Sequence, residues 1–134
     1  MPLVRIELIK GRRDEEIAAI GEAVQKALVA TMNVPVHDRF QVVTEHDRTR
    51  FLYNDGYLGV KRTDGIVFIQ VFLSKGRITE QKHAFYALAT KLLSEDAKTR
   101  PEDVAITLVE NAREDWSFGR GVAQYVVLPP DQWK

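Results

Sequence analysis

The chain has 134 residues, enough for one domain with a substantial core, and its 19 basic residues balance 19 acidic ones. That balance argues against a nucleic-acid-binding surface, and no apolar run approaches the ~20 residues that span a membrane. The absence of cysteine excludes disulfides and thiolate chemistry and, with an N-terminus unlike a signal peptide, favours a cytoplasmic protein.

The first predicted element is a strand at residues 3–9, and a proline stands directly before it. Proline has no backbone N–H to give to a sheet, but it is tolerated at the first position of a strand. Pro2 therefore has two interpretations. It is a tolerated strand start or, once Met1 is removed, a free secondary amine, which is a reactive group that no internal residue can supply.

A helix follows, with Asp14 as its expected N-cap and further acidic residues in the first turn, where the helix dipole favours them. Apolar residues then recur at helical spacing as far as Met32 and make one apolar face. Pro35 predicts the end of this helix, because the residue before a proline avoids helical geometry. A second strand is predicted at residues 40–45.

The sequence then repeats itself. Lys10-Gly11-Arg12 recurs as Lys75-Gly76-Arg77, an offset of 75 − 10 = 65 residues, and the same offset aligns Asp38 with Asp103. The second copy predicts a strand at residues 66–73, a helix that starts near Thr79 and ends before Pro101, and a strand at residues 104–110.

These elements predict one domain at residues 1–134. Its two units are expected at residues 2–46 and 66–111. A polar insertion at residues 47–65 separates them, and a loop and short strand at residues 112–134 follow.

Each unit is a strand, a helix and a strand, so together they predict an α+β fold, a four-stranded mixed sheet with both helices on one face. The strand IVFIQVFL is apolar on both sides, so the opposite face of the sheet needs a cover. Because the chain offers no third layer, we expect an obligate homo-oligomer.

Four chemically capable residues converge if the two units run antiparallel in the sheet. The loop after the strand at residues 66–73 then lies beside the chain start, which brings Lys75 and Arg77 near Pro2 and Asp38. Each also has a plain structural interpretation. Asp38 is suited to a turn, and the two cations are suited to a solvated loop.

Two aromatic residues, Trp116 and Phe118, precede the flexible Gly119-Arg120-Gly121. They either anchor a loop or form the wall of a pocket.

Four stretches resemble the tautomerase superfamily, namely MPLVRIELIKGR, VPVHDRFQVVTEH, SKGRITEQK and LVENAREDWSFGRG. Within it the similarity is closest to the malonate semialdehyde decarboxylase family, and it runs nearly end to end. The resemblance implies two β-α-β units, assembly as a trimer and catalysis through an amino-terminal proline.

The resemblance also implies residue roles. Pro2 matches the family's catalytic proline, Asp38 the acid beside it, and Arg77 one of two arginines that grip the substrate carboxylate. Lys75 stands where the family has its second arginine, and a lysine cannot give the planar, bidentate grip of a guanidinium. Related dehalogenases use a histidine in the first helix, where this chain has Leu28 and Val29, so dehalogenation is disfavoured.

We therefore expect a Pro2-dependent enzyme without metal or other cofactor, since His37, His46 and His83 lack the spacing of metal ligands. Its expected reaction is decarboxylation of a small 3-oxo acid like malonate semialdehyde, with hydratase or tautomerase side activity. Asp38 would assist Pro2, Arg77 and Lys75 would orient the carboxylate, and Trp116 and Phe118 would exclude water. The alternatives are a tautomerase of 2-oxo acids like phenylpyruvate and a non-catalytic oligomeric binding protein. No nucleic acid or membrane partner is expected.

Overall fold

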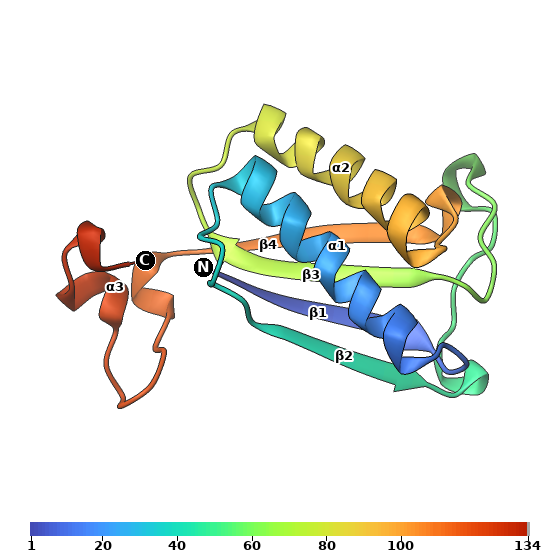
Figure 1. Ribbon diagram of the computed structural model, residues 1–134, viewed down its shortest axis with the longest axis horizontal. Coiled ribbons are helices and arrows are strands. Elements are labelled where there is room, and N and C mark those ends of the chain that lie inside the picture. Colours follow the sequence, from blue (N-terminus) through green and yellow to red (C-terminus); the bar gives the residue numbers. More distant parts are fainter. Residues whose placement is uncertain (134) are drawn as a thin grey trace.

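A computed structural model describes residues 1–133 as a four-stranded sheet with two long helices on one face (Figure 1). The elements are β1 (Pro2–Ile9), α1 (Asp14–Met32), β2 (Gln41–His46), β3 (Val67–Ser74), α2 (Thr79–Ala97), β4 (Val104–Asn111) and the short α3 (Gln124–Val127). The expected pair of β-α-β units and the expected mixed sheet are confirmed. Within residues 1–133, no helix combines the length and the apolar character needed to cross a membrane.

The strand order is β2-β1-β3-β4. Each unit contributes a parallel pair, β1 with β2 and β3 with β4, and the units meet at the antiparallel pair β1 and β3. In that central pairing Pro2 lies opposite Leu73 and Ile6 opposite Ile69. The start of the chain therefore lies beside the end of β3 and the loop that follows it.

The core lies between the sheet and the two helices. Alternate residues of β1 and β3 face the helices and are fully buried, among them Ile6 and Ile69. They pack against the apolar faces of α1 and α2, where Leu28 and Phe85 are also fully buried.

The opposite face of the sheet carries apolar side chains that the chain itself leaves partly accessible. Leu3, Phe72 and Val109 form one row across β1, β3 and β4, and Val109 is 41% exposed. Val42 on β2 is 49% exposed. This face is the one for which the sequence predicted a cover.

The repeat is visible in the backbone. The loops after β1 and β3 each contain a glycine at positive φ, Gly11 at 134° and Gly76 at 129°, a conformation that side chains with a Cβ rarely adopt. Lys10-Gly11-Arg12 and Lys75-Gly76-Arg77 therefore make the same turn between a strand and a helix, as the offset of the sequence repeat predicts.

Two local expectations are wrong. Asp14 is the first residue of α1 rather than its cap, and extended Arg13 occupies the cap position without a side-chain cap bond. The expected short strand near the C-terminus is instead the one-turn helix α3. Among residues 1–133 no strand pairs with that segment, and its backbone bonds locally, with the N–H of Leu128 donating to the carbonyl of Gln124 at 2.9 Å.

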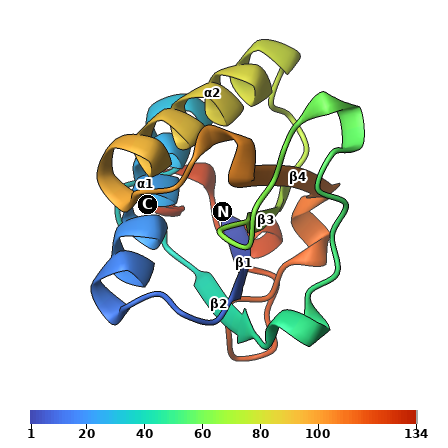
Figure 2. The ribbon, with the colours of Figure 1, turned by 90° about the vertical axis from the view of Figure 1, so that its right-hand side faces the viewer.

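The insertion crosses the end of the sheet that lies far from the chain start, where Figure 2 shows it joining β2 to β3. A buried carboxylate holds it there. Asp103, only 2% exposed, accepts hydrogen bonds from the backbone N–H and the hydroxyl of Thr63, each at 2.7 Å. Arg12 donates to the carbonyl of Gly65 at 2.6 Å.

We predict that Asp103→Ala lowers the free energy of unfolding by about 2 kcal/mol, because the two donors of Thr63 lose their acceptor. Chemical denaturation at fixed protein concentration measures the change. Asp103→Asn keeps an acceptor and is expected to lose less, and Asp55→Ala in an exposed turn serves as the neutral control. An Asp103→Ala protein as stable as the wild type would show that other contacts hold the insertion.

Candidate active site

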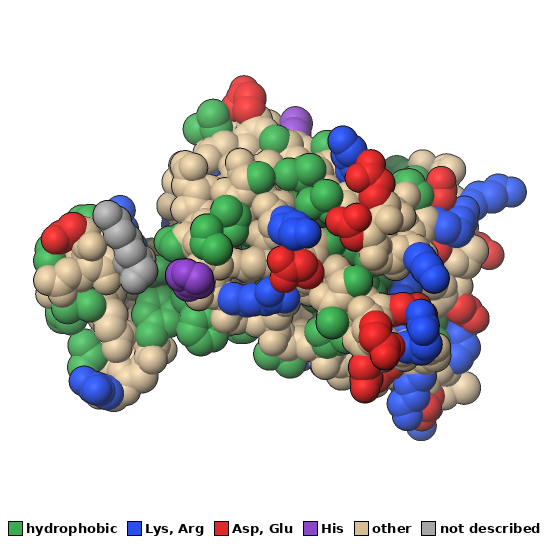
Figure 3. All heavy atoms as spheres, viewed as in Figure 1, with side chains coloured by type: hydrophobic (Ala, Val, Ile, Leu, Met, Phe, Trp, Pro, Cys, Tyr) green, Lys and Arg blue, Asp and Glu red, His purple; other side chains and the backbone are tan. Residues whose placement is uncertain are grey.

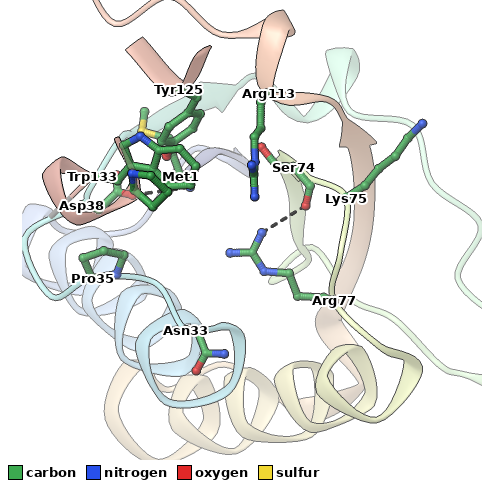
Figure 4. A pocket seen from close by; sticks show the side chains of 11 residues that line it. Met1, Asn33, Pro35, Asp38, Ser74, Lys75, Arg77, Arg113, Tyr125 and Trp133 are labelled. Carbon is green, nitrogen blue, oxygen red and sulfur yellow. Dashed lines mark hydrogen bonds and ion pairs between the residues drawn. The ribbon is translucent and has the colours of Figure 1, made fainter. Parts of the chain in front are cut away.

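A cavity of about 310 Å³ lies at the end of the sheet where the chain begins (Figure 4). Four segments line it, namely Met1, the link between α1 and β2, the loop after β3, and the C-terminal segment from residue 113 to residue 133. The antiparallel pairing of β1 and β3 places the first and third of these side by side. The segment between α1 and β2 reaches the cavity because β2 runs parallel to β1 and therefore starts at the same end of the sheet.

Arg77 is fixed by the backbone around it. Its Nε donates to the carbonyl of Met32 at 3.1 Å, and its Nη1 donates to the carbonyl of Ser74 at 3.0 Å. These two bonds hold the half-buried guanidinium in one orientation and leave the Nη2 donors for another acceptor.

The terminal ammonium of the chain lies against a carboxylate. The nitrogen of Met1 is 3.6 Å from Oδ2 of Asp38, whose side chain is 14% exposed. Burial lowers the pKa of this ammonium below its usual value, against the attraction of Asp38, and the charge of Arg77 lowers it further. Burial raises the pKa of Asp38, against the attraction of the ammonium and of Arg77. The pair therefore favours an uncharged amine more than it would in water.

Pro2 lies directly behind this amine. It is buried as the first residue of β1, and with Met1 attached its nitrogen is an amide without basic character. Met1 rather than Pro2 therefore lines the cavity, together with Asp38 and Arg77. Met1 therefore occupies the position beside Asp38 and Arg77 that the sequence predicted for Pro2.

The two predicted basic residues behave differently. Lys75 is among the residues that border the cavity, but its side chain extends away from the centre (Figure 4). Arg113, which the sequence analysis did not single out, points into the cavity toward Arg77. The signal for it is positional, because it follows β4, and β4 ends at the same edge of the sheet as its parallel neighbour β3.

Aromatic side chains form a continuous row of ring contacts along the C-terminal segment, the first stacked and the other two edge-to-face. Trp116 lies on Phe118 with ring centroids 5.6 Å apart, Phe118 contacts Tyr125 at 5.0 Å, and Tyr125 contacts Trp133 at 5.0 Å. In the space-filling view, apolar side chains gather between this segment and the body of the molecule (Figure 3). The sequence analysis did not anticipate Tyr125 and Trp133, because they follow the recognisable motif.

Of the two predicted aromatic residues, Phe118 lines a second cavity of about 320 Å³ and Trp116 stands behind it. The indole N–H of Trp116 donates to Oδ1 of Asn111 at 2.8 Å, which anchors the loop to the end of β4. The two cavities adjoin, because both are bordered by Met1, Asp38, Tyr125 and Trp133. Burial raises the pKa of Tyr125 to about 12, so its hydroxyl remains a donor at neutral pH.

The described residues offer no metal centre. Across residues 1–133, no three histidine, cysteine, aspartate or glutamate side chains gather closely enough to hold an ion. His46 instead pairs with Glu7 across β1 and β2 at 2.9 Å. The chemistry that the cavity itself supports is that of an amine beside a carboxylate, with guanidinium groups placed to bind an anion.

Comparison with known proteins places these features in context. Two family models, both described as tautomerase enzyme, match residues 2–61 and residues 38–119. The probable tautomerase YusQ of Bacillus subtilis (strain 168) is 37% identical over 126 residues, which cover 94% of this chain and 99% of that protein. The probable tautomerase YrdN of the same organism is 36% identical over 126 residues, which cover 94% and 97%.

Solved structures show the same similarity. Malonate semialdehyde decarboxylase is 38% identical with a TM-score of 0.88 over 92% of this chain and 95% of that one. FG41 malonate semialdehyde decarboxylase inhibited by 3-bromopropiolate is 42% identical with a TM-score of 0.87 over 92% and 94%. A fused 4-OT symmetric trimer, at 19% identity and a TM-score of 0.75 over 93% and 98%, shares the fold.

We predict that Asp38→Asn makes the protein more stable at pH 7 than the wild type. Because the pKa of Asp38 is raised in the folded chain, the folded state holds this proton more tightly than the unfolded state does. The ionised carboxylate therefore destabilises the fold above its folded pKa. It has no such effect well below the unfolded value of about 3.9. Chemical denaturation is expected to give Asp38→Asn a higher free energy of unfolding than the wild type at pH 7. This difference is expected to be smaller at pH 3.

The control for this measurement is Asp55→Asn in an exposed turn, for which little change is expected at either pH. A lower stability of Asp38→Asn at pH 7 would contradict the prediction and would mean that the ion pair with the terminal ammonium outweighs the burial of the carboxylate.

Proposed function

Since the chain belongs to the tautomerase family of enzymes, we propose that it decarboxylates a small 3-oxo acid, such as malonate semialdehyde, through the amine of Pro2. The observation that carries this proposal is the buried contact of the terminal amine with Asp38 in a cavity that Arg77 also lines. Hydratase or tautomerase turnover at the same site is expected as a side activity.

The proposal requires removal of Met1. Methionine aminopeptidases act before proline, and with Met1 attached it is Met1, not Pro2, that lines the cavity. After removal, Pro2 starts the chain with a secondary amine. If that amine takes the place of the amine of Met1 beside Asp38 and Arg77, burial and Arg77 would lower its pKa and Asp38 would raise it, as they do for Met1. A lowered pKa increases the neutral fraction of the amine, and the neutral form is the one that acts as a nucleophile or a general base.

With a neutral amine, the decarboxylation proceeds through an iminium intermediate. The nitrogen of Pro2 adds to the carbonyl carbon of the 3-oxo acid, water leaves, and a cationic iminium forms. The bond to the carboxylate carbon then breaks, its electron pair moves toward the iminium nitrogen, and carbon dioxide leaves. Protonation of the resulting enamine at carbon and addition of water release the aldehyde and restore the amine. Asp38 is placed to carry the proton at each stage, and Arg77 to orient the carboxylate.

If the amine is instead charged, it donates to the carbonyl oxygen and stabilises the enolate that forms as carbon dioxide leaves. Asp38 favours this form. In either route the contacting aromatic residues of the C-terminal segment, Phe118 and Tyr125 among them, limit the access of water to the cavity.

A second candidate is keto–enol tautomerisation of a 2-oxo acid like phenylpyruvate. The similar proteins YusQ and YrdN are named probable tautomerases, and the aromatic second cavity, lined by Phe40 and Phe118, offers space for a ring. This reaction needs the same groups in a simpler sequence, in which the amine moves a proton between carbon and oxygen while Arg77 holds the carboxylate.

Assembly as a homotrimer is part of the proposal. The apolar row of Leu3, Phe72 and Val109 lies on the sheet face without helices, and burying it between copies would remove it from water. The fused 4-OT structures, which share the fold, are trimers.

We predict that Pro2→Ala lowers kcat/KM for decarboxylation of malonate semialdehyde by at least about a hundredfold, the contribution typical of a positioned proton-transfer group. Arg77→Ala is expected to raise KM strongly, because the carboxylate loses its fixed partner. Arg50→Ala, which removes an exposed arginine after β2, is the control. The same variants are assayed on the enol of phenylpyruvate.

Native mass spectrometry of the same samples reports whether Met1 is absent and how many copies assemble. Full activity on both substrates in Pro2→Ala and Arg77→Ala would contradict the enzymatic proposal and leave an oligomeric binding protein. Activity on phenylpyruvate alone would select the tautomerase.

A further inference from the structure

The cavity contains an arginine that the fold does not use. The guanidinium of Arg113 points toward the centre of the cavity and toward Arg77 (Figure 4). Within residues 1–133 it has no ion pair and no hydrogen bond from its side chain. Its one specific contact is with Trp133, whose ring centroid lies 4.7 Å from the guanidinium carbon.

The contact with Trp133 orients Arg113 without consuming its donors. A cation above an aromatic face keeps its N–H groups in the plane of the guanidinium, so all of them remain available at its edge. Trp133 is in turn held by its indole N–H, which donates to the carbonyl of Leu128 at 3.2 Å, and by packing against Tyr125. The C-terminal segment thus supplies a platform on which Arg113 rests.

A third donor completes the arrangement. The hydroxyl oxygen of Ser74 is buried, has no hydrogen-bond partner in the described structure and belongs to a residue that lines the cavity. Ser74 lies close to Arg77, whose Nη1 donates to its carbonyl. An unpartnered hydroxyl beside two guanidinium groups is suited to an oxygen ligand that carries negative charge.

The charge of the cavity favours the same ligand. Its lining contains the cations of Lys75, Arg77 and Arg113 but only one carboxylate, that of Asp38, which already faces the terminal amine. A small monocarboxylate would reduce this excess of positive charge, and a neutral analogue would not.

We propose that Arg113, together with Arg77, binds the substrate carboxylate, in the role that sequence comparison gave to Lys75. This inference rests on the proposed function for the identity of the substrate. Arg113 restores the planar grip that a lysine cannot provide, and it does so from the segment after β4 instead of the loop after β3. Trp133 is a positioning residue, since it acts through Arg113.

The test measures binding of 3-hydroxypropanoate, a carboxylate without the carbonyl group on which the proposed chemistry acts, by calorimetry. The matched neutral probe is 3-hydroxypropanamide. We expect the wild type to prefer the carboxylate. Arg113→Ala is expected to weaken carboxylate binding about tenfold to a hundredfold, the range of a hydrogen-bonded charge, and to leave binding of the amide unchanged. Arg113→Lys is expected to fall between Arg113→Ala and the wild type.

The comparison variants separate Arg113 from general charge. Lys75→Ala removes a cation at the border of the cavity, and Arg120→Ala removes one from the loop before α3; each is expected to weaken binding less than twofold. Trp133→Leu is expected to weaken the carboxylate less than Arg113→Ala does, because it only loosens the guanidinium. Arg113 is exposed in a short turn, so circular dichroism is expected to show an intact fold for its variants.

Wild-type affinity in Arg113→Ala, an equal or larger loss in Lys75→Ala, or no preference of the wild type for carboxylate over amide would each overturn the inference. These outcomes do not depend on turnover. A protein that binds the carboxylate through Arg113 but decarboxylates no oxo acid retains this inference and loses the proposed function. If Arg113→Ala decarboxylates the oxo acid with the KM of the wild type, the proposed function is retained and this inference is lost.

Discussion

The antiparallel pairing of β1 with β3 is the constraint on which the rest of the site depends. It sets Pro2 opposite Leu73, so the first atoms of the chain lie beside the loop that carries Arg77. The amine reaches this position because β1 begins at the second residue of the chain, which places the terminal nitrogen directly at the end of the sheet. Burial then shifts the proton equilibrium of that amine and of Asp38 toward their uncharged forms.

Duplication gives the fold two equivalent ends, and the chain uses them differently. At one end, Asp103 and Arg12 correspond to Asp38 and Arg77, but their polar groups are bonded to the insertion, and Asp103 is sealed from water. At the other end Asp38 faces the terminal amine and lines an open cavity. The same residue type therefore stabilises one end and is available for chemistry at the other, which is the usual exchange between stability and function.

The C-terminal segment supplies what the repeated units lack. Its contacting aromatic rings run from Trp116 to Trp133, and Tyr125 and Trp133 line the cavity together with Met1. In Figure 1 this segment lies beyond the end of the sheet at which the chain begins. The segment that follows the first unit, residues 47–65, lies at the other end of the sheet, where Thr63 bonds to Asp103. Differences in substrate between similar proteins of this fold are therefore expected to arise from the C-terminal segment, whereas the amine and its acid belong to the shared scaffold.

The sequence by itself determined the repeat, the two β-α-β units and where the two long helices end, because these follow from periodicity, prolines and a constant offset. Only the tertiary structure decided the direction of each side chain. Lys75 and Arg77 flank Gly76 at positive φ, which turns the chain between them, and only Arg77 finds carbonyls to hold it over the cavity. Arg113 enters because parallel β3 and β4 end together, and α3 replaces a strand because no partner lies beside it. Such outcomes depend on contacts between segments distant in sequence, which no local pattern records.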